Sequence, residues 1–373
     1  MAMKRDNILI SGAEVQNVSS GNRGAEQLLR TASSRIRSFG YQPSVSAGKV
    51  DPGLASELGL NKYVGNVRLK SLDQFTPRVR VGSYTTIKSV SAVLDASGFA
   101  FGDAWGIHTA LWLGRKYQQW RMNDIDIVLL PQAFGPFTGE PYRRVAREAL
   151  LNANAIYARE RSSYEHLLDL GLPPERCKIA PDITIGEANR DSVIAAESRV
   201  PRLVIVPNWN LAVRGSDAKY MDTLVAAVKW ARMNRIEPVG LLHEGRRDLQ
   251  LLERVAEAAP LEIVSNLTGW QTKEYIGKSK LVLSGRYHAV LAALATNTPV
   301  VTHSWSHKYE QVLTQFGVSE WLKSPTDSAA TTAGLDALVQ HGAPEELVLR
   351  LDALSREVQT MWSDVAEVLH GNH

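Results

Sequence analysis

The stretch Leu281–Ala295, which reads LVLSGRYHAVLAALA, decides the fold class of this chain. It joins a short apolar strand directly to an apolar helix through Ser284, Gly285 and Arg286, as is typical of parallel α/β sheets. The first N–H groups of such a helix lack partners within the helix, and the helix dipole directs its positive end at the turn. An anion is therefore expected to bind at this turn.

Two side chains at the turn suggest chemistry as well as binding. Arg286 offers a planar, two-pronged donor, and His288 is a side chain that exchanges a proton near neutral pH. Each has a plainer explanation, because an arginine here can simply pair with a carboxylate and a histidine can be a hydrogen-bonded core residue. Their occurrence together at one turn favours a functional interpretation.

Length and composition bound the class of protein. A chain of 373 residues is too long for one compact core, and it fits two domains of about 150 to 200 residues each. Hydrophobic residues make up 44% and charged residues 22%, the values of a globular enzyme rather than of a disordered chain. The net charge of +3 is small and the basic residues are spread along the chain, so no nucleic-acid partner is expected.

Cysteine content and hydropathy indicate the cellular compartment in which the protein works. Cys177 is the only cysteine, which excludes an internal disulfide and a thiolate metal cluster and indicates a reducing environment. The apolar run near the N-terminus is too short for a secretory signal, and no run reaches the roughly 18 apolar residues of a transmembrane helix. We expect a cytoplasmic protein that can associate peripherally with a membrane through a lipid-linked substrate.

Short apolar runs alternate with amphipathic stretches along most of the chain, which predicts parallel sheets covered by helices. In the first half the predicted strands are 8–11, 92–95, 125–130, 155–158 and 178–180, and the predicted helices are 24–39, 142–153 and 163–170. In the second half the predicted strands are 203–206, 238–242, 262–264, 281–283 and 300–301, and the predicted helices are 217–233, 247–258, 272–277 and 308–316.

The polar stretch Glu187–Ser198 interrupts this alternation and is the expected domain boundary. We predict an N-terminal Rossmann-like domain over residues 1–190, on the acceptor side, and a C-terminal Rossmann-like domain over 199–343, on the donor and anion side. Residues 344–373 are predicted to form a long amphipathic helix that packs back across the domains.

Ligands of parallel sheets bind beyond the carboxyl ends of the strands, so the loops after the strands hold the candidate residues. The first such loop, 12–24, contains Asn22 and Gly24 but no GxGxxG, so a dinucleotide fingerprint is absent. The loop 95–106 surrounds Asp103 with glycines and aromatic residues, which suits either a sugar-contacting surface or a packed structural loop.

Further candidates follow other strands. Residues 131–136, PQAFGP, are predicted to form a rigid turn that directs Gln132 into a cleft, and Arg159 stands at a second strand-to-helix turn. His243 and Glu244 are more simply explained as a structural ion pair. Lys308 is expected near Arg286, whereas His303 and His307 lack the neighbouring carboxylates of a metal site, so no metal is expected.

The order of several short motifs resembles the polysaccharide pyruvyl transferase family over roughly residues 8–325. The motifs are Asn22-Arg23-Gly24, PQAFGP at 131–136, ARERSS at 158–163, LLDLGL at 167–172, APD at 180–182, SGRYHA at 284–289 and SHK at 306–308. The resemblance implies a fold like the GT-B glycosyltransferases, in which two Rossmann-like domains face each other across a cleft. It also implies transfer of the pyruvyl group of phosphoenolpyruvate to a sugar, commonly as a cyclic ketal.

The resemblance assigns roles that agree with the residue chemistry. His288 is the expected general acid–base group, and Arg286 is its catalytic partner. The sequence leaves open which proton His288 transfers. Phosphoenolpyruvate is a co-substrate that needs clustered cationic donors, and no further cofactor is expected. The expected substrate-binding residues are Arg159, Lys308, Asn22, Gly24, Asp103, Gln132, Gly285 and His307.

Two other functions remain open at this point. A nucleotide-sugar glycosyltransferase can use the same scaffold, with Glu244 as a ribose-binding carboxylate. A catalytically silent member of the family would bind glycans through the aromatic loop around Trp105 and would tolerate loss of His288.

Overall fold

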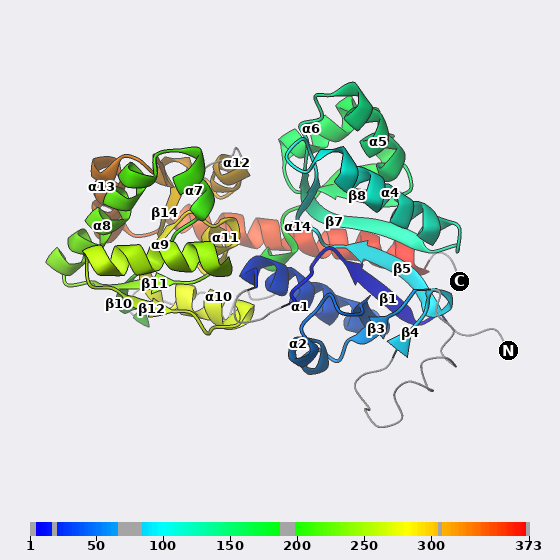
Figure 1. The fold of residues 1–373 in the computed structure, drawn as a ribbon, viewed down its shortest axis with the longest axis horizontal. Coiled ribbons are helices and arrows are strands. Elements are labelled where there is room, and N and C mark those ends of the chain that lie inside the picture. The colour runs from blue at the N-terminus through cyan, green and yellow to red at the C-terminus, as the bar shows by residue number, and fades with distance from the viewer. Residues whose placement is uncertain (1–4, 17–20, 66–83, 187–197, 305–307, 371–373) are drawn as a thin grey trace. The chain divides into compact units, whose positions relative to one another are not determined.

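The computed structural model describes residues 5–16, 21–65, 84–186, 198–304 and 308–370. The chain forms two compact units (Figure 1). Unit 1 comprises Met1–Asn17, Ala25–Thr184 and Glu357–His373, and unit 2 comprises Val18–Gly24 and Ile185–Arg356. Most of the expected boundary stretch Glu187–Ser198 lies outside the described residues, as do Ser19, Ser20 and His307.

Unit 1 is built on a parallel sheet whose described strands follow the order β4-β3-β2-β1-β5-β7-β8-β9, with β6 added beside β7. The strands are β1 (Asn7–Ser11), β2 (Gln42–Ser46), β3 (Asn61–Tyr63), β4 (Tyr84–Thr85), β5 (Val90–Asp95), β6 (Phe99–Phe101), β7 (Asp126–Phe134), β8 (Ala155–Ala158) and β9 (Cys177–Ile179). The helices are α1 (Arg23–Ser38), α2 (Pro52–Glu57), α4 (Gly106–Arg121), α5 (Glu140–Leu150) and α6 (Arg161–Asp169).

The central strands of unit 1 are apolar because helices cover the sheet. Every residue of β7 is buried, and α4 packs Tyr117 and Trp120 into the same core as Leu129. Figure 1 shows α4, α5 and α6 grouped around β7 and β8. Helices α4 and α5 approach closely at Gly114, where an added Cβ would lie 3.1 Å from the Cβ of Ala149.

Unit 2 has a second parallel sheet with the order β12-β11-β10-β13-β14-β15. Its strands are β10 (Val200–Val206), β11 (Glu237–Leu241), β12 (Glu262–Val264), β13 (Ser279–Ser284), β14 (Val300–His303) and β15 (Leu322–Lys323). Its helices are α7 (Trp209–Arg214), α8 (Asp217–Met233), α9 (Gly245–Ala258), α10 (Gly269–Gly277), α11 (Tyr287–Ala295), α12 (Lys308–Gln315) and α13 (Ser328–His341).

The strand Leu281–Leu283 and the apolar helix after it occupy the middle of this second sheet. Strand β13 pairs with β10 on one side and β14 on the other, with Ser284 opposite Val206. Helix α11 is buried at nearly every position. A helix with no polar face is expected in such a central place.

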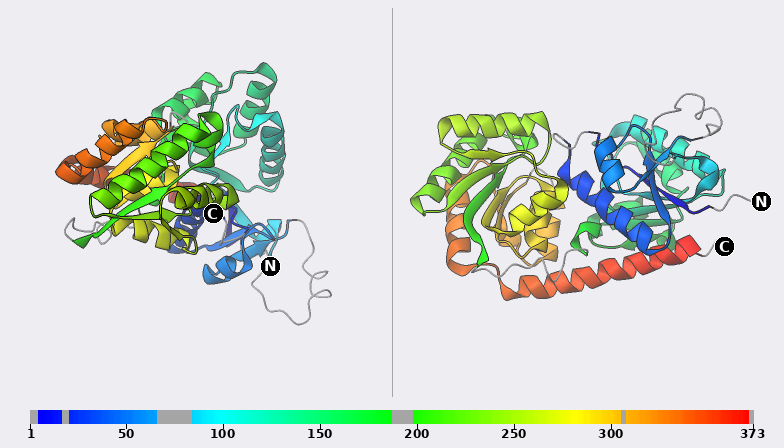
Figure 2. Two further views of the ribbon diagram at one scale, coloured as in Figure 1. Left: turned by 60° about the vertical axis from the view of Figure 1, so that its left-hand side comes forward. Right: turned by 90° about the horizontal axis from the view of Figure 1, so that it is seen from below.

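Helix α14 (Glu345–His370) contributes residues to both units, with the division after Arg356. Figure 2 shows it as one uninterrupted helix. Its second part belongs to unit 1, where Lys178 Nζ lies 2.6 Å from Asp364 Oδ2 and Arg35 donates to Gln359. The predicted long C-terminal helix is confirmed.

All the strands and helices predicted from the alternation of apolar and amphipathic segments are present, with boundaries shifted by a few residues. One prediction was wrong: Pro131–Phe134 continue β7 rather than forming a turn, and the chain turns only at the cis bond between Gly135 and Pro136. The loop 95–106 contains strand β6, and helix α4 directly after it was not predicted. Within the described residues, no helix combines the length and apolar character needed to cross a membrane.

His303, at the end of β14, gives the stability of unit 2 a pH dependence. Its ring is fully buried and shares a hydrogen bond of 3.0 Å with Thr331 Oγ1. Burial lowers the pKa of His303 to about 3, whereas an unfolded histidine has a pKa of about 6.5. The unfolded state therefore binds the extra proton between these two values, and stability is lost as the pH falls.

We expect the free energy of unfolding to decrease below about pH 6.5 by up to 1.4 kcal/mol per pH unit from this residue. Chemical denaturation of the wild type and of His303→Gln across this range measures the two slopes. The variant loses the Thr331 contact and is less stable at pH 7, but its pH slope should be shallower. Equal slopes would show that His303 is not the titrating group.

Candidate functional site at the carboxyl edge of unit 2

The carboxyl ends of the strands of unit 2 gather polar and charged side chains at one edge of the sheet. Asn208 follows β10, His243 and Glu244 follow β11, and Arg286 follows β13. The segment 21–24, which belongs to the same unit, joins them, because the backbone N–H of Arg23 donates to the carbonyl of His243 at 3.3 Å. This is the edge where parallel sheets bind ligands.

Arg286 is held by two carboxylates of α9 and of the turn before it. Its Nε donates to Asp248 Oδ2 at 2.6 Å and its Nη2 to Asp248 Oδ1 at 2.7 Å, a two-pronged pair. Its Nη1 donates to Glu244 Oε2. The plainer expectation for this arginine, pairing with a carboxylate, is therefore met in the structure.

These bonds engage three of the five guanidinium N–H groups of Arg286. Among the described residues, no partner is found for one hydrogen on each of Nη1 and Nη2. Asp248 is buried and Glu244 is partly exposed. Burial raises the pKa of Asp248, and the Arg286 guanidinium opposes that rise. The inner carboxylate thus fixes the arginine, while the outer one can be reached by solvent.

Gly285 has a structural role at this turn. A Cβ at Gly285 would lie 2.5 Å from Leu211 Cδ1 and 3.1 Å from Asn208 Cβ. Its carbonyl accepts hydrogen bonds from Asn208 Nδ2 at 2.7 Å and from the Tyr309 hydroxyl at 2.8 Å. The glycine lets β13 approach α7, and these bonds fix the backbone that carries Arg286.

His243 does not form the predicted ion pair with Glu244. Its ring is buried, and within the described part of the chain neither ring nitrogen has a hydrogen-bond partner. Burial lowers the pKa of His243 well below its usual value, and the positive charges of Arg286, His288 and Arg23 lower it further. Glu244 instead contacts Arg286 and accepts from Asn22 Nδ2 at 3.1 Å.

His288 lies in the first turn of α11 against the segment 21–24. An added Cβ at Gly24 would lie 2.1 Å from His288 Nδ1, so only glycine leaves room for the imidazole. Arg23 is buried beside it and donates from Nη2 to the carbonyl of Ser265 at 3.3 Å. The structure thus brings the predicted residues Asn22, Gly24, Arg286 and His288 together in one unit.

Lys308, at the start of α12, is also part of this group. Its Nζ lies 5.4 Å from the ring centre of Tyr287 and 5.6 Å from that of Tyr309. Tyr287 is the direct neighbour of Arg286, so Lys308 is near the turn, as predicted. His307, which precedes it, is outside the described residues.

In unit 1 the corresponding edge holds Arg159. This buried arginine donates from Nη1 to Asp182 Oδ2 at 3.1 Å, and its Nε lies 3.5 Å from Glu160 Oε2. Asp182 also accepts from the backbone N–H and the hydroxyl of Thr184. Arg159 therefore forms ion pairs with acidic residues, as Arg286 does.

Two other predicted residues of unit 1 have contrasting surroundings. Gln132 is fully buried in β7, and neither polar atom of its side chain has a partner among the described residues. Asp103 is exposed and accepts from the N–H of Thr138 at 3.1 Å and from its hydroxyl at 2.7 Å. Both carboxylate oxygens of Asp103 therefore contact Thr138.

The sequence analysis did not identify Asp248 or Arg23 as members of the site. Asp248 lies in the first turn of α9, four residues after Glu244. This short spacing could have suggested that both carboxylates lie at the carboxyl edge of the sheet. No spacing rule relates it to Arg286, which is far away in the sequence. Arg23 stood within the motif Asn22-Arg23-Gly24 without an assigned role.

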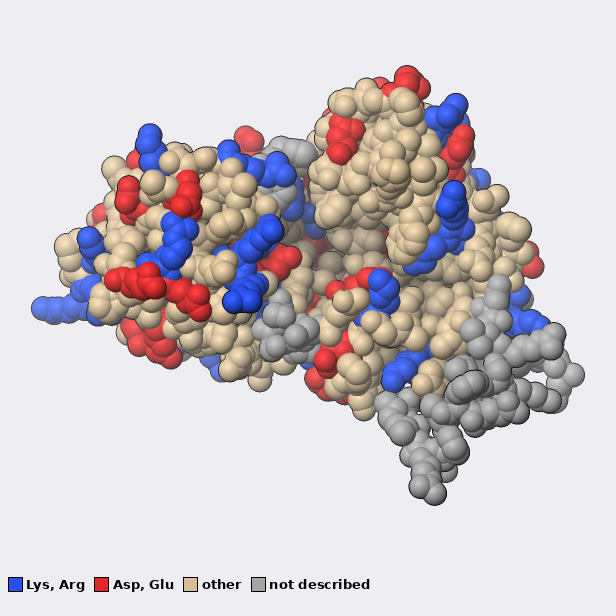
Figure 3. All heavy atoms as spheres, viewed as in Figure 1, with Lys and Arg blue, Asp and Glu red and all other residues tan. Residues whose placement is uncertain are grey.

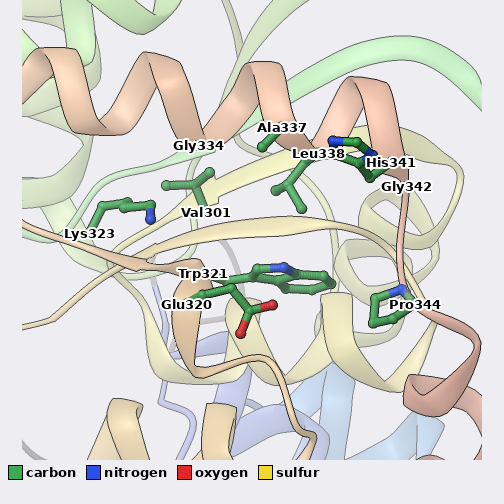
Figure 4. A pocket seen from close by; sticks show the side chains of 10 residues that line it. All are labelled: Val301, Glu320, Trp321, Lys323, Gly334, Ala337, Leu338, His341, Gly342 and Pro344. Carbon is green, nitrogen blue, oxygen red and sulfur yellow. The ribbon is translucent and has the colours of Figure 1, made fainter.

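A cavity of about 290 Å³ lies elsewhere in unit 2, between α13 and the segment that leads into β15. Figure 4 shows Trp321 and Leu338 facing each other across it, with Lys323 and His341 at its two ends. None of the predicted site residues lines it. On the visible face of each unit, basic and acidic side chains are interspersed (Figure 3), so a bound anion depends on local contacts.

Solved structures show that the fold is of the GT-B type, with two Rossmann-like domains. MnaA of S. aureus, solved with UDP, has a TM-score of 0.60 at 13% identity and covers 98% of this chain and 97% of its own. HepE of Anabaena, solved with UDP and glucose, gives 0.60 at 12% identity, covering 98% and 99%. The UDP-GlcNAc 2-epimerase of Neisseria meningitidis, bound to UDP-GlcNAc, gives 0.57 at 12% identity, covering 97% and 100%. Such low identities establish the fold alone.

The family is shown by the sequence. The model of the polysaccharide pyruvyl transferase family matches residues 22–307, and the chain belongs to this family. Comparison with curated proteins gives no significant match.

Proposed function

We propose that this protein transfers the pyruvyl group of phosphoenolpyruvate to a sugar of a cell-surface or exopolysaccharide precursor and forms a pyruvate ketal. The observation that carries the proposal is the arrangement around Arg286. This arginine is fixed by Asp248, retains two N–H donors without a partner in the described structure, and stands beside His288 and Lys308. Membership of the pyruvyl transferase family supports the choice of donor.

The proposed donor suits this site because it is small and carries two anionic groups, a phosphate and a carboxylate. Such a ligand is bound by clustered cations and by a helix N-terminus rather than by a large apolar pocket. Arg286 and the N–H groups at the start of α11 would hold one anionic group, and Lys308 would contribute a point charge.

The reaction balances with two acceptor hydroxyl groups. One hydroxyl oxygen bonds to C2 of phosphoenolpyruvate and loses its proton, and the methylene carbon C3 gains one proton and becomes a methyl group. The bond between C2 and the phosphate oxygen breaks, and phosphate leaves with the electron pair. The second hydroxyl oxygen then closes the ketal at C2, and its proton ends on phosphate or water.

His288 is the proposed general acid–base group. It would either protonate C3 or accept the proton of the attacking hydroxyl, both of which a positioned imidazole can do. Arg286 and the start of α11 would stabilise the departing phosphate, whose negative charge grows as the bond breaks. Gly24 sets the position of the imidazole, because any larger residue would occupy its space.

We assign the acceptor to unit 1, with Asp103 and Gln132 as proposed contacts and Arg159 as a further cationic contact to substrate. The unpartnered amide of Gln132 supports this choice, because a buried amide without partners is costly unless a ligand or water satisfies it. Asn22 is the proposed substrate contact beside Glu244 in unit 2. We also propose a cytoplasmic location, which the single cysteine supports.

Thermal unfolding with single ligands tests the donor assignment. Phosphoenolpyruvate at about 100 times its dissociation constant should stabilise the native state by about 2.7 kcal/mol, which is a rise of a few degrees in Tm. Inorganic phosphate and pyruvate serve as controls for general anion binding and should have smaller effects. A rise with UDP-glucose but not with phosphoenolpyruvate would overturn the proposal in favour of a nucleotide-sugar glycosyltransferase.

Product analysis then tests the reaction itself. Incubation with phosphoenolpyruvate and a panel of glycan acceptors should release phosphate and increase the acceptor mass by the amount expected for a pyruvate ketal. Donor binding without product on any acceptor would favour a catalytically silent member of the family.

A further inference from the structure

His243 is a buried polar side chain to which the proposed reaction gives no role. It follows β11 at the carboxyl edge of unit 2 and is only 3% exposed. Among the described residues neither Nδ1 nor Nε2 finds a hydrogen-bond partner, and both atoms are closed off from solvent. Leaving a buried polar group unpaired destabilises the native state. A native protein retains such a group where a ligand, a reaction or an enclosed water molecule gives it a partner.

The backbone explains the place of His243 but not its side chain. The N–H of Leu242 donates to the carbonyl of Val264 at 2.9 Å, and the carbonyl of His243 accepts from the N–H of Arg23 at 3.3 Å. These bonds hold residue 243 at the edge of the sheet whatever side chain it carries. An apolar side chain would pack there without unpaired polar atoms, so stability gives no reason for an imidazole.

The charges that act on the His243 ring are basic. Burial has the largest effect and lowers its pKa well below the usual value, and three basic residues lower it further, namely Arg286, His288 and Arg23. The ring is therefore neutral at pH 7. A neutral imidazole carries one N–H donor and one acceptor nitrogen.

The partner that suits this ring accepts a hydrogen bond and is stable among positive charges. The two carboxylates that follow along the chain do not supply it, because Glu244 and Asp248 bond to Arg286. An oxygen of a bound anion meets both conditions, since it accepts N–H bonds and is attracted by the surrounding cations. Arg286 precedes the first turn of α11, where such an anion is expected to bind.

We propose that the His243 imidazole donates its N–H to an oxygen of the oxyanion bound at Arg286, which makes His243 a binding residue of the donor site. The inference rests on the anion site of the proposed function but not on pyruvyl transfer. It gives the two histidines different roles, because His288 exchanges a proton whereas His243 stays neutral and orients the anion. Since the ring is closed off from solvent, the anion reaches it after a local shift of the segment 21–24, whose Arg23 bonds to the His243 carbonyl.

Anion titrations of two variants test this role. His243→Leu removes both ring nitrogens, and His243→Gln restores an N–H donor. Phosphoenolpyruvate, inorganic phosphate and pyruvate are titrated separately, so that the phosphate and carboxylate contacts can be told apart. His243→Leu should weaken binding of phosphoenolpyruvate, and of the smaller anion that shares the contacted group, about tenfold, as for loss of one hydrogen bond to a charged group. His243→Gln should recover most of this affinity.

The stability of the same variants distinguishes a binding role from a structural one. The Tm of His243→Leu without added anion should equal or exceed that of the wild type, because a buried unpaired polar group is removed. The matched control is His303→Leu, since His303 is buried in the same unit but already shares a hydrogen bond of 3.0 Å with Thr331 Oγ1. His303→Leu should lower the Tm and leave anion affinity unchanged, which is the reverse pattern.

The wild-type protein provides a measurement that does not depend on the folding of a variant. Nitrogen-15 spectra of protein labelled at histidine report the protonation and hydrogen bonding of each ring. Saturating phosphoenolpyruvate or phosphate should shift the His243 ring signals to those of a hydrogen-bonded, neutral imidazole. Unshifted His243 signals at saturation would contradict the proposed contact.

The outcomes separate this inference from the proposed function. Unchanged anion affinity in His243→Leu would overturn the inference and leave an enclosed water molecule as the partner of the ring. Equal losses of affinity in His243→Leu and His303→Leu, or a wild type that binds none of the three anions, would overturn it as well. If the wild type binds phosphate but not phosphoenolpyruvate, and His243→Leu weakens phosphate binding, the inference stands and the proposed donor is wrong.

Discussion

Replacing His288 by alanine is expected to lower kcat by about 10³-fold, within the range that one general acid–base group contributes. Binding of phosphoenolpyruvate should survive, because the anion contacts come from Arg286, Lys308 and the start of α11. Steady-state phosphate release measures turnover, and the donor-induced rise in Tm measures binding. Arg286→Ala should lose both, since it removes a binding group.

Two further variants make the His288 result specific. Gly24→Ala places a methyl group in the space of the imidazole and should also lower kcat strongly while His288 remains in the sequence. His341→Ala removes an exposed histidine of unit 2 far along the chain and should leave kcat unchanged. Near-normal turnover in His288→Ala would refute the catalytic assignment, whatever the Gly24 variant does.

Replacing Asp248 by alanine is expected to cost about 3 kcal/mol of unfolding free energy, because it leaves the largely buried Arg286 without its main counter-charge and with Glu244 alone. Asp248 makes two bonds to Arg286 and also accepts from the backbone N–H of Trp209 at 2.9 Å. Donor affinity should fall too, since the guanidinium loses its fixed orientation. Chemical denaturation gives the stability, and titration with phosphoenolpyruvate gives the affinity.

Asp217→Ala is the matched control. Asp217 forms the same two-pronged pair with Arg254, at 3.0 and 2.7 Å, but on the surface. Its loss should cost less than about 1 kcal/mol and leave donor binding unchanged. Comparable costs for the two variants would show that the Asp248 pair is not a buried anchor.

Replacing Glu244, the outer carboxylate, should have the opposite effect on donor affinity. Glu244 contacts Arg286 and is partly exposed, so Glu244→Gln removes a negative charge that competes with an incoming anion. Its stability should change little, and its affinity for phosphoenolpyruvate should rise. A fall in affinity would mean that Glu244 helps to hold the donor rather than opposing it.

Local patterns predicted the central parallel strands because such strands are buried on both faces and read as continuous apolar runs. Strand β8 and the last four residues of β10 follow this pattern. The strands β2, β3, β4 and β15, which lack such runs, were not predicted. Helix α4 was missed because its sequence mixes aromatic, basic and apolar residues without a clear polar face. Its exposed side carries Leu111 and Trp112, which periodicity alone would place inside.

The sequence by itself determined the two α/β units, the strand-to-helix turn at Arg286 and the family, because each depends on residues close together along the chain or on the order of short motifs. Only the tertiary structure decided which charges meet. Glu244 and Asp248 at the start of α9 meet Arg286 at the start of α11, and His288 meets Gly24 across more than half the chain. Such contacts are selected by burial and by the need to neutralise a buried charge, which no local spacing encodes.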